Sequence, residues 1–142
     1  MTLVHSIMRI YSQPSMHQIW NNHLFVLEGM EILKQNVGSP LDAIFVCCGG
    51  GGMLAGIAAY VKQVRPHTKV IGVEAEDAAG MTASLRKGEV VTLDSVGLFA
   101  DGAAVKTIGT ETFRVCNNLV DEMVTVTTDQ ICNAIKLCYN DA

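Results

Sequence analysis

The sequence predicts an α/β domain built on a doubly wound parallel sheet with helices on both of its faces. Three observations point to this class. Short apolar runs typical of buried strands alternate with segments whose apolar residues recur every three or four positions. Four consecutive glycines connect the first apolar run to the helical pattern that follows it. The chain has 142 residues, which is enough to bury one core.

The first helix is expected to begin near Leu27, where an irregular N-terminal sequence becomes periodic. Leu27, Met30, Leu33 and Val37 recur at three- and four-residue spacing and form one apolar stripe. Gly38 follows this stripe and is suited to end a helix. Ordered structure is therefore expected from about residue 27 onward.

The next three elements surround the glycines. Residues 43–47 and 70–73 are continuous apolar runs, as expected for strands buried on both faces. Between them, residues 54–64 place apolar side chains on one helix face until Pro66 ends the pattern. The uncharged stretch 43–61 is long enough to span a membrane. Four glycines at its centre disfavour a membrane helix, so we expect strand, loop and helix and no membrane segment.

The same alternation continues to the end of the chain. Arg86, Lys87 and Gly88 are residues typical of a helix C-terminus, and Thr127 with Gln130 has the spacing of a capping box before a final helix. The remaining expected elements are a helix over 78–88, a loop with irregular strand over 89–107, a helix over 110–120, a strand over 123–126 and a last helix after Thr127.

Composition limits the class of protein. A net charge of -4 without charged blocks argues against nucleic-acid binding, and 17% charged residues with a mean hydropathy of +0.30 exclude a disordered chain. Five cysteines without C-x-x-C spacing predict no disulfide framework and a reducing compartment. We therefore expect a soluble intracellular protein, in the cytoplasm or inside an organelle. Cys47 and Cys48 are expected to be small buried side chains at a strand end.

The four glycines, Gly49, Gly50, Gly51 and Gly52, carry the clearest chemical information. A strand that leads through them into a helix presents backbone N–H groups that no Cβ shields, at the positive end of the helix dipole. Such a loop binds anions, and phosphate in particular. In a parallel sheet the carboxyl ends of the strands are also where ligands bind.

Two phosphate ligands fit this loop. The pattern Gly50-x-Gly52-x-x-Ala55, with Glu74 at the end of the next strand, satisfies the fingerprint of a dinucleotide site. The alternative is a small cofactor with a single phosphate held by successive amides, which suits an unbroken glycine quartet better. A non-catalytic module that binds another subunit through a sheet edge is a third possibility. A Walker-type loop is excluded because neither Lys-Ser nor Lys-Thr follows the glycines.

Three segments besides the glycines resemble a known enzyme family. They are Leu-Asp-Ala-Ile-Phe-Val at 41–46, Val-Ile-Gly-Val-Glu at 70–74 and Phe-Ala-Asp-Gly-Ala-Ala-Val-Lys at 99–106. Together with the glycine quartet they closely resemble biosynthetic threonine dehydratase (threonine ammonia-lyase). That family belongs to the pyridoxal-phosphate enzymes of the tryptophan-synthase-β fold, also called fold type II. The resemblance extends from about Gly29 to Asp141.

The resemblance implies a cofactor, a substrate and site residues. In the family the tetraglycine loop and the next residue hold the phosphate of pyridoxal 5'-phosphate, which maps to Gly49, Gly50, Gly51, Gly52 and Met53. The glycine of the Ala-Asp-Gly segment lies against the cofactor ring, which maps to Gly102. The parent enzyme would convert L-threonine, with L-serine as a second candidate substrate, to a 2-oxo acid and ammonia in isoleucine biosynthesis. We expect a homo-oligomer with no nucleic-acid or membrane partner.

Other parts of the family pattern do not occur in the sequence. Neither the Ser-Phe-Lys-x-Arg-Gly motif, whose lysine forms the Schiff base, nor the Gly-Asn-His substrate motif is found, so no catalytic residue is assigned. The family's Gly-Gln-Gly-Thr stretch is replaced by Leu-Phe-Val-Leu at 24–27. We therefore expect a fragment with a divergent segment over 1–27 and a partial cofactor-binding catalytic domain over 28–142.

A metal site is not expected. Relatives place a glutamate at the position of Glu74 together with an aspartate whose equivalent here is Gly80. With that carboxylate missing, the ligand set for a hard cation is too small. We therefore predict that Glu74 is either solvated or caps a helix.

Overall fold

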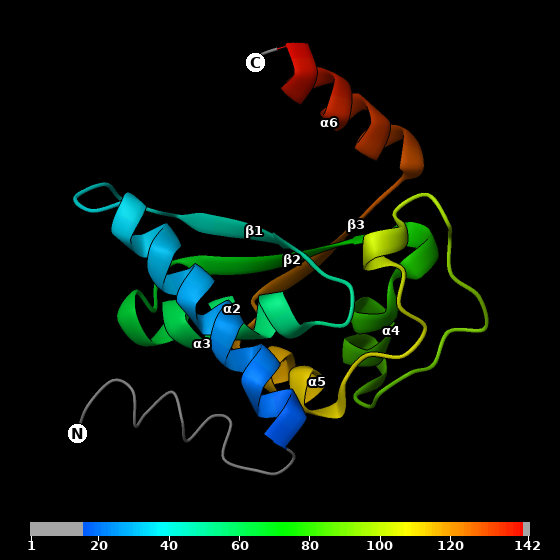
Figure 1. Ribbon diagram of the computed structural model, residues 1–142, viewed down its shortest axis with the longest axis horizontal. Coiled ribbons are helices and arrows are strands. Elements are labelled where there is room, and N and C mark those ends of the chain that lie inside the picture. The colour runs from blue at the N-terminus through cyan, green and yellow to red at the C-terminus, as the bar shows by residue number, and fades with distance from the viewer. Residues whose placement is uncertain (1–15, 141–142) are drawn as a thin grey trace.

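The computed structural model describes the backbone of residues 16–140 and the side chains of residues 25–140. Helices, short 3-10 turns and strands follow one another in the order expected for an α/β domain (Figure 1). The elements are α2 (Met16–Gln35), β1 (Ala43–Cys47), α3 (Gly52–Val64), β2 (Lys69–Ala75), η1 (Glu76–Ala78), α4 (Gly80–Lys87), η2 (Asp101–Ala103), α5 (Thr110–Leu119), β3 (Glu122–Val126) and α6 (Thr128–Asn140).

The three strands form one parallel sheet in the order β1-β2-β3. Ala43 of β1 is opposite Lys69 of β2, and Ile71 of β2 is opposite Glu122 of β3. All three carboxyl ends therefore lie at the same edge, which is the edge where the glycine loop begins. The predicted strands 43–47, 70–73 and 123–126 are confirmed to within two residues at either end.

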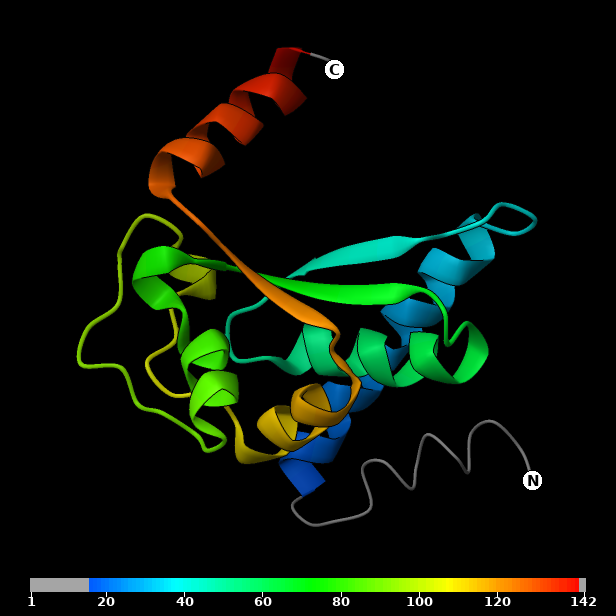
Figure 2. The same ribbon diagram turned by 180° about the vertical axis from the view of Figure 1, so that it is seen from behind.

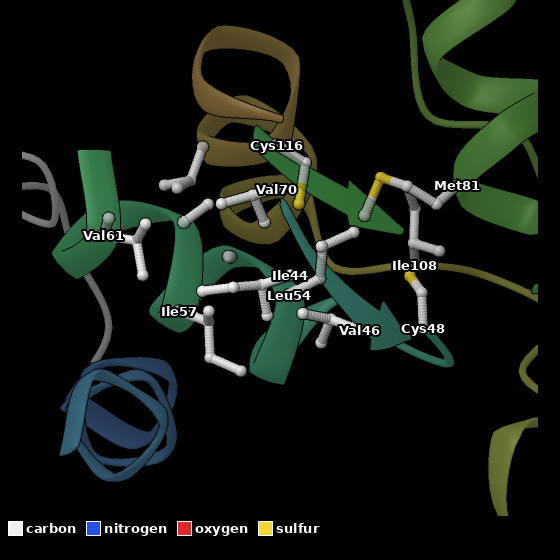
Figure 3. Close-up of a cluster of buried hydrophobic side chains, with 14 of the residues drawn as sticks. Ile44, Val46, Cys48, Leu54, Ile57, Val61, Val70, Met81, Ile108 and Cys116 are labelled. Atoms are coloured by element: carbon white, nitrogen blue, oxygen red, sulfur yellow. The ribbon is translucent and has the colours of Figure 1, made fainter. Parts of the chain in front are cut away.

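Helices lie on both sides of the sheet, which confirms the predicted fold class. In both ribbon views α3, α4 and α5 lie on one side and α6 on the other (Figures 1 and 2). The close-up in Figure 3 shows the buried side chains between β1, β2, α3 and α5. This core includes Ile44, Val46, Leu54, Ile57, Val61, Val70, Val115 and Cys116.

Helix α2 crosses α3 at close range. A Cβ at Gly29 would lie 3.1 Å from the Cβ of Tyr60, and Gly56 of α3 lies directly against the backbone of Phe25. Small residues at these two crossing points allow the helix axes to approach each other. Gly56 therefore lies at a helix crossing inside the domain. It belongs to the uncharged stretch 43–61, which by its length alone could span a membrane.

The prediction for this first helix is wrong in two respects. The helix begins at Met16 rather than near Leu27, and the side chains of Leu27 and Val37 are 50% and 78% exposed. Leu33 of the stripe is buried in the core, but Leu27 is not, because the buried side of α2 is set by its close contact with α3. Val37 lies beyond the end of the helix. Helix α2 continues through residue 27. The predicted division of the chain into a segment over 1–27 and a domain over 28–142 stays a prediction.

The later elements agree with their sequence signals. Gly88 ends α4 with a φ of 79°, and Thr127 and Gln130 form both hydrogen bonds of the capping box at 2.8 and 3.2 Å. Residues 89–107 contain one isolated bridge, Thr92 to Thr107, and the short turn η2. None of the helices in the described part of the chain is both long and apolar enough to cross a bilayer.

Candidate functional site

The glycine loop joins the end of β1 to the start of α3, as the sequence predicts. The N–H of Cys48 donates to the carbonyl of Val73 at 2.8 Å and extends the β1–β2 pairing by one residue. Gly51 precedes the helix with a φ of 87°, a conformation that favours glycine, and provides no capping side chain. The first helical bond of α3 is from the N–H of Ala55 to the carbonyl of Gly51 at 2.9 Å.

The N–H groups of Gly52, Met53 and Leu54 therefore precede the first hydrogen bond of α3. The opening N–H groups of any helix have no partner inside the helix. They also lie where the dipole of the 13-residue helix is positive. An anion placed at this end would accept hydrogen bonds from the backbone and be stabilised by the dipole.

Space around the loop is asymmetric. A Cβ at Gly49 would lie 3.1 Å from the Cα and carbonyl oxygen of Ala103, and a Cβ at Gly51 would collide with the methyl group of Met81. At Gly50 and Gly102, by contrast, an added Cβ meets nothing within 4 Å. One side of the loop is thus packed, and an open space lies beside Gly50.

The structure brings the Ala-Asp-Gly segment against the glycine loop. Gly102 lies in the turn η2, where its N–H donates to Oδ1 of Asp101 at 2.8 Å. Its neighbour Ala103 contacts Gly49 through the backbone. The five predicted phosphate-loop residues and Gly102 therefore lie in one region, although about 50 residues separate the two segments in sequence.

Thr112 belongs to the same region and was missed by the sequence analysis. Its Oγ1 lies 2.9 Å from the carbonyl oxygen of Gly50 and 2.8 Å from that of Gly109, so the hydroxyl donates to these acceptors. Thr112 lies in the first turn of α5. Nothing in the spacing or composition around it indicates a contact 62 residues away.

Glu74 is a helix cap, which confirms one of the two predicted roles. Its side chain is 1% exposed, so the alternative of a solvated glutamate is wrong. One carboxylate oxygen accepts the N–H of Met81 at 2.8 Å, and the other accepts the N–H and the hydroxyl of Thr82 at 2.8 and 2.7 Å. Both oxygens are thus engaged at the start of α4.

Metal ligands do not gather elsewhere in the chain that the structure describes. Among those residues no group of three or more His, Cys, Asp or Glu side chains is placed to hold a metal ion.

The two cysteines at the end of β1 differ in exposure. Cys48 is 2% exposed, as predicted, whereas Cys47 is exposed and the prediction of a buried side chain is wrong there. Cys47 belongs to the opposite face because successive strand residues alternate between faces.

Burial, assisted by the nearby charge of Glu74, raises the pKa of the Cys48 thiol well above its usual range. The same causes raise the pKa of Cys116 to about 12, so both buried thiols stay protonated at neutral pH.

Comparison with known proteins gives a consistent result. Residues 11–142 match the family model described as "Pyridoxal-phosphate dependent enzyme". The chain is 59% identical over 112 residues to the biosynthetic L-threonine dehydratase of Burkholderia multivorans and 61% identical over 113 residues to the chloroplastic enzyme of Arabidopsis thaliana. These matches cover 79% and 80% of this chain but 22% and 19% of the relatives, so the chain spans about a fifth of their length.

A solved structure shows the same likeness in three dimensions. The processed form of threonine deaminase isoform 2 from Solanum lycopersicum matches with a TM-score of 0.79 and 46% identity, over 82% of this chain and 33% of that chain. The predicted resemblance and the fold-type-II class are thus confirmed, and the dinucleotide alternative gains no support. The chain belongs to the family of pyridoxal-phosphate dependent enzymes.

Proposed function

We propose that this chain forms the part of a threonine dehydratase that holds the cofactor phosphate. The single observation that carries the proposal is the glycine loop between β1 and α3, with helical N–H groups on one side and open space at Gly50 and Gly102. The likeness to threonine dehydratases supports L-threonine as the substrate of the full-length enzyme, with 2-oxobutanoate and ammonia as products. L-serine is the second candidate substrate.

The residues present fit pyridoxal 5'-phosphate. The backbone N–H groups of Gly49, Gly50, Gly51, Gly52 and Met53 would hold its phosphate, and the backbone of Gly102 would lie along its ring. When bound, pyridoxal phosphate supplies an electron sink for the negative charge that develops at the α-carbon of an amino acid. The chain's own contribution is to fix the phosphate at the positive end of α3.

We expect this chain to bind the cofactor without turning over threonine. The sequence contains no Ser-Phe-Lys-x-Arg-Gly motif. Lys62 donates to the carbonyl of Thr68 at 2.8 Å and pairs with Asp121, and Lys106 donates to the carbonyl of Asp94 at 3.1 Å. These two lysines are thus committed to structural contacts. Steady production of 2-oxobutanoate that disappears when the glycine loop is altered would contradict this expectation.

The full-length parent is further proposed to be a homo-oligomer in the cytoplasm or in an organelle. The chloroplastic and mitochondrial relatives support an organelle as one setting. Sedimentation of the longer protein would test the oligomeric state.

The test of the binding proposal is a calorimetric titration of the purified chain with pyridoxal phosphate, using Gly51→Val as the disrupting variant. A β-branched residue at a φ of 87° is strained, and its side chain would collide with Met81 on the packed side of the loop. The matched control is Gly88→Val, which carries the same kind of strain at a φ of 79° in a place where an added Cβ meets nothing within 4 Å.

Three outcomes separate the candidate functions. Binding by the native chain and by Gly88→Val but not by Gly51→Val supports the proposal. A folded native chain that binds NAD but not pyridoxal phosphate would establish the dinucleotide alternative instead. Equal binding by both variants would place the phosphate elsewhere and overturn the assignment of the loop.

A further inference from the structure

The hydroxyl of Thr112 makes a hydrogen bond to the glycine loop from a distant part of the chain. Its Oγ1 lies 2.9 Å from the carbonyl oxygen of Gly50, and the two residues are 62 positions apart. A hydroxyl has one proton, which is shared between this acceptor and the carbonyl of Gly109 at 2.8 Å. The bond joins the loop to α5, a helix on which the sequence analysis placed no site residue.

This bond fixes the direction of the peptide that follows Gly50. In a trans peptide the C=O of one residue and the N–H of the next point in opposite directions. Holding the carbonyl of Gly50 toward α5 therefore turns the N–H of Gly51 away from α5, toward the side where an anion would lie. The opposite orientation would present a carbonyl oxygen to the anion and repel it.

The position of Thr112 is itself well supported. Val115 and Cys116 on the same helix are 1% and 0% exposed, so the core anchors α5. A Cβ built at Gly51 would lie 3.1 Å from Oγ1 and 3.2 Å from Cβ of Thr112, so the side chain lies against the loop. A loop of four glycines has high conformational freedom, and an external contact is the means of selecting one conformation.

We propose that Thr112 is a positioning residue that presets the glycine loop for phosphate. It does not touch the cofactor; it holds the carbonyl of Gly50 so that the neighbouring N–H groups converge. This inference rests on the proposed function, because it names a residue that acts on the same site.

The test compares Thr112→Val, Thr112→Ser and the control Thr110→Val in calorimetric titrations with pyridoxal phosphate and with inorganic phosphate. Valine keeps the shape of threonine but cannot donate a hydrogen bond, whereas serine keeps the hydroxyl. Thr110 is an exposed residue in the same first turn of α5. Circular dichroism confirms that each variant is folded at the temperature of the titration.

We expect Thr112→Val to bind pyridoxal phosphate about fivefold more weakly, as for the loss of one hydrogen bond. Thr112→Ser and Thr110→Val should remain within about twofold of the native chain. A second readout that does not depend on activity is the amide spectrum of the chain labelled with ¹⁵N. Addition of inorganic phosphate should shift the Gly51 and Gly52 signals in the native chain and in Thr112→Ser, and less in Thr112→Val.

The results distinguish this inference from the proposed function. If the native chain binds the cofactor and Thr112→Val binds it equally well, the positioning role is wrong while the function stands. If Thr112→Ser is as weak as Thr112→Val, packing of the methyl group rather than the hydroxyl matters, and the inference is overturned. If the folded native chain binds neither ligand, the proposed function fails first.

Discussion

At the edge strand β1 the two faces of the sheet differ in how well this chain covers them. On the face toward α3, Ile44 and Val46 of β1 are buried. On the other face Phe45 is 66% exposed and Cys47 is exposed as well. Helix α6 lies on that side, but it extends away from the strands and buries none of its residues (Figure 2).

The comparison shows which part of the molecule supports the candidate site. The glycine loop leaves β1 and enters α3 on the packed side, and Thr112 reaches it from α5, which packs on the same core. The site therefore depends on the covered face for its geometry. The exposed face contributes apolar surface, which drives association rather than folding.

The largest expected effect is from Leu54→Ala on the packed face. Leu54 is completely buried, and its removal should lower the free energy of unfolding by about 2–5 kcal/mol. Urea denaturation followed by circular dichroism measures the change. The matched control on the other face, Phe45→Ala, should change it by less than about 1 kcal/mol. Equal losses from the two variants would show that both faces are covered in solution.

The cap at the start of α4 should contribute less than a core side chain. Glu74→Gln keeps the size of the side chain but replaces one acceptor oxygen with an amide that cannot accept the N–H bonds seen here. We expect unfolding to become easier by about 1–3 kcal/mol. The control is Glu76→Gln on the exposed neighbour two residues on. A neutral result for Glu74→Gln would mean that the cap is replaced by water at no cost.

The third prediction concerns the ion pair between Lys62 of α3 and Asp121, the residue directly before β3. Asp121 lies 2.7 Å from Nζ of Lys62 and accepts the N–H of Val70 at 2.6 Å. Partial burial raises the pKa of Asp121, but the bonds from Lys62 and Val70 outweigh this and hold it below the ordinary value of 3.8. Since the folded pKa is lowered, the stabilisation is present above pH 3.8 and is lost as the pH falls through the folded pKa.

The measurement is the free energy of unfolding of Asp121→Asn and of the native chain between pH 7 and pH 3. At pH 7 the variant should be less stable by up to about 1 kcal/mol, as for a partly exposed ion pair. The difference should shrink toward zero below pH 3.8. A difference that stays constant down to pH 3 would assign the effect to shape rather than charge.

The smallest effect on unfolding, but a clear one on association, is expected from Phe45→Ser. This change removes the most prominent apolar side chain of the exposed strand face and leaves the packed face intact. We expect the native chain to associate at micromolar concentrations and the variant to do so less, because less apolar surface is available. Sedimentation over a concentration series measures this. Identical profiles would locate the association surface elsewhere.

Several features follow from local sequence alone. The order of strands and helices is encoded by the switch between continuous apolar runs and helical spacing, and the structure agrees with it from β1 onward. The capping box at Thr127 and the glycine end of α4 at Gly88 involve neighbours a few residues apart. Such contacts are independent of the rest of the fold, so sequence spacing suffices to predict them.

Helix α2 shows where this reasoning fails. Its apolar stripe predicts a buried Leu27, yet the helix presents Gly29 to α3 instead. The close approach of the α2 and α3 backbones took precedence over the burial of the Leu27 side chain. The periodicity of one helix carries no information about the shape of the helix that packs against it. Cys47 fails for a related reason, because a continuous apolar run does not reveal which face of the strand is covered.

The sequence by itself determined the fold class, the family and the glycine loop, because each rests on residues that are adjacent or regularly spaced along the chain. Only the tertiary structure decided what surrounds that loop. Thr112 reaches Gly50 across 62 residues, and Glu74 is fully engaged at the start of α4 rather than solvated. Both facts depend on how α4 and α5 pack against the sheet, and hydrogen bonds between distant elements exist only after that packing has brought them within about 3 Å.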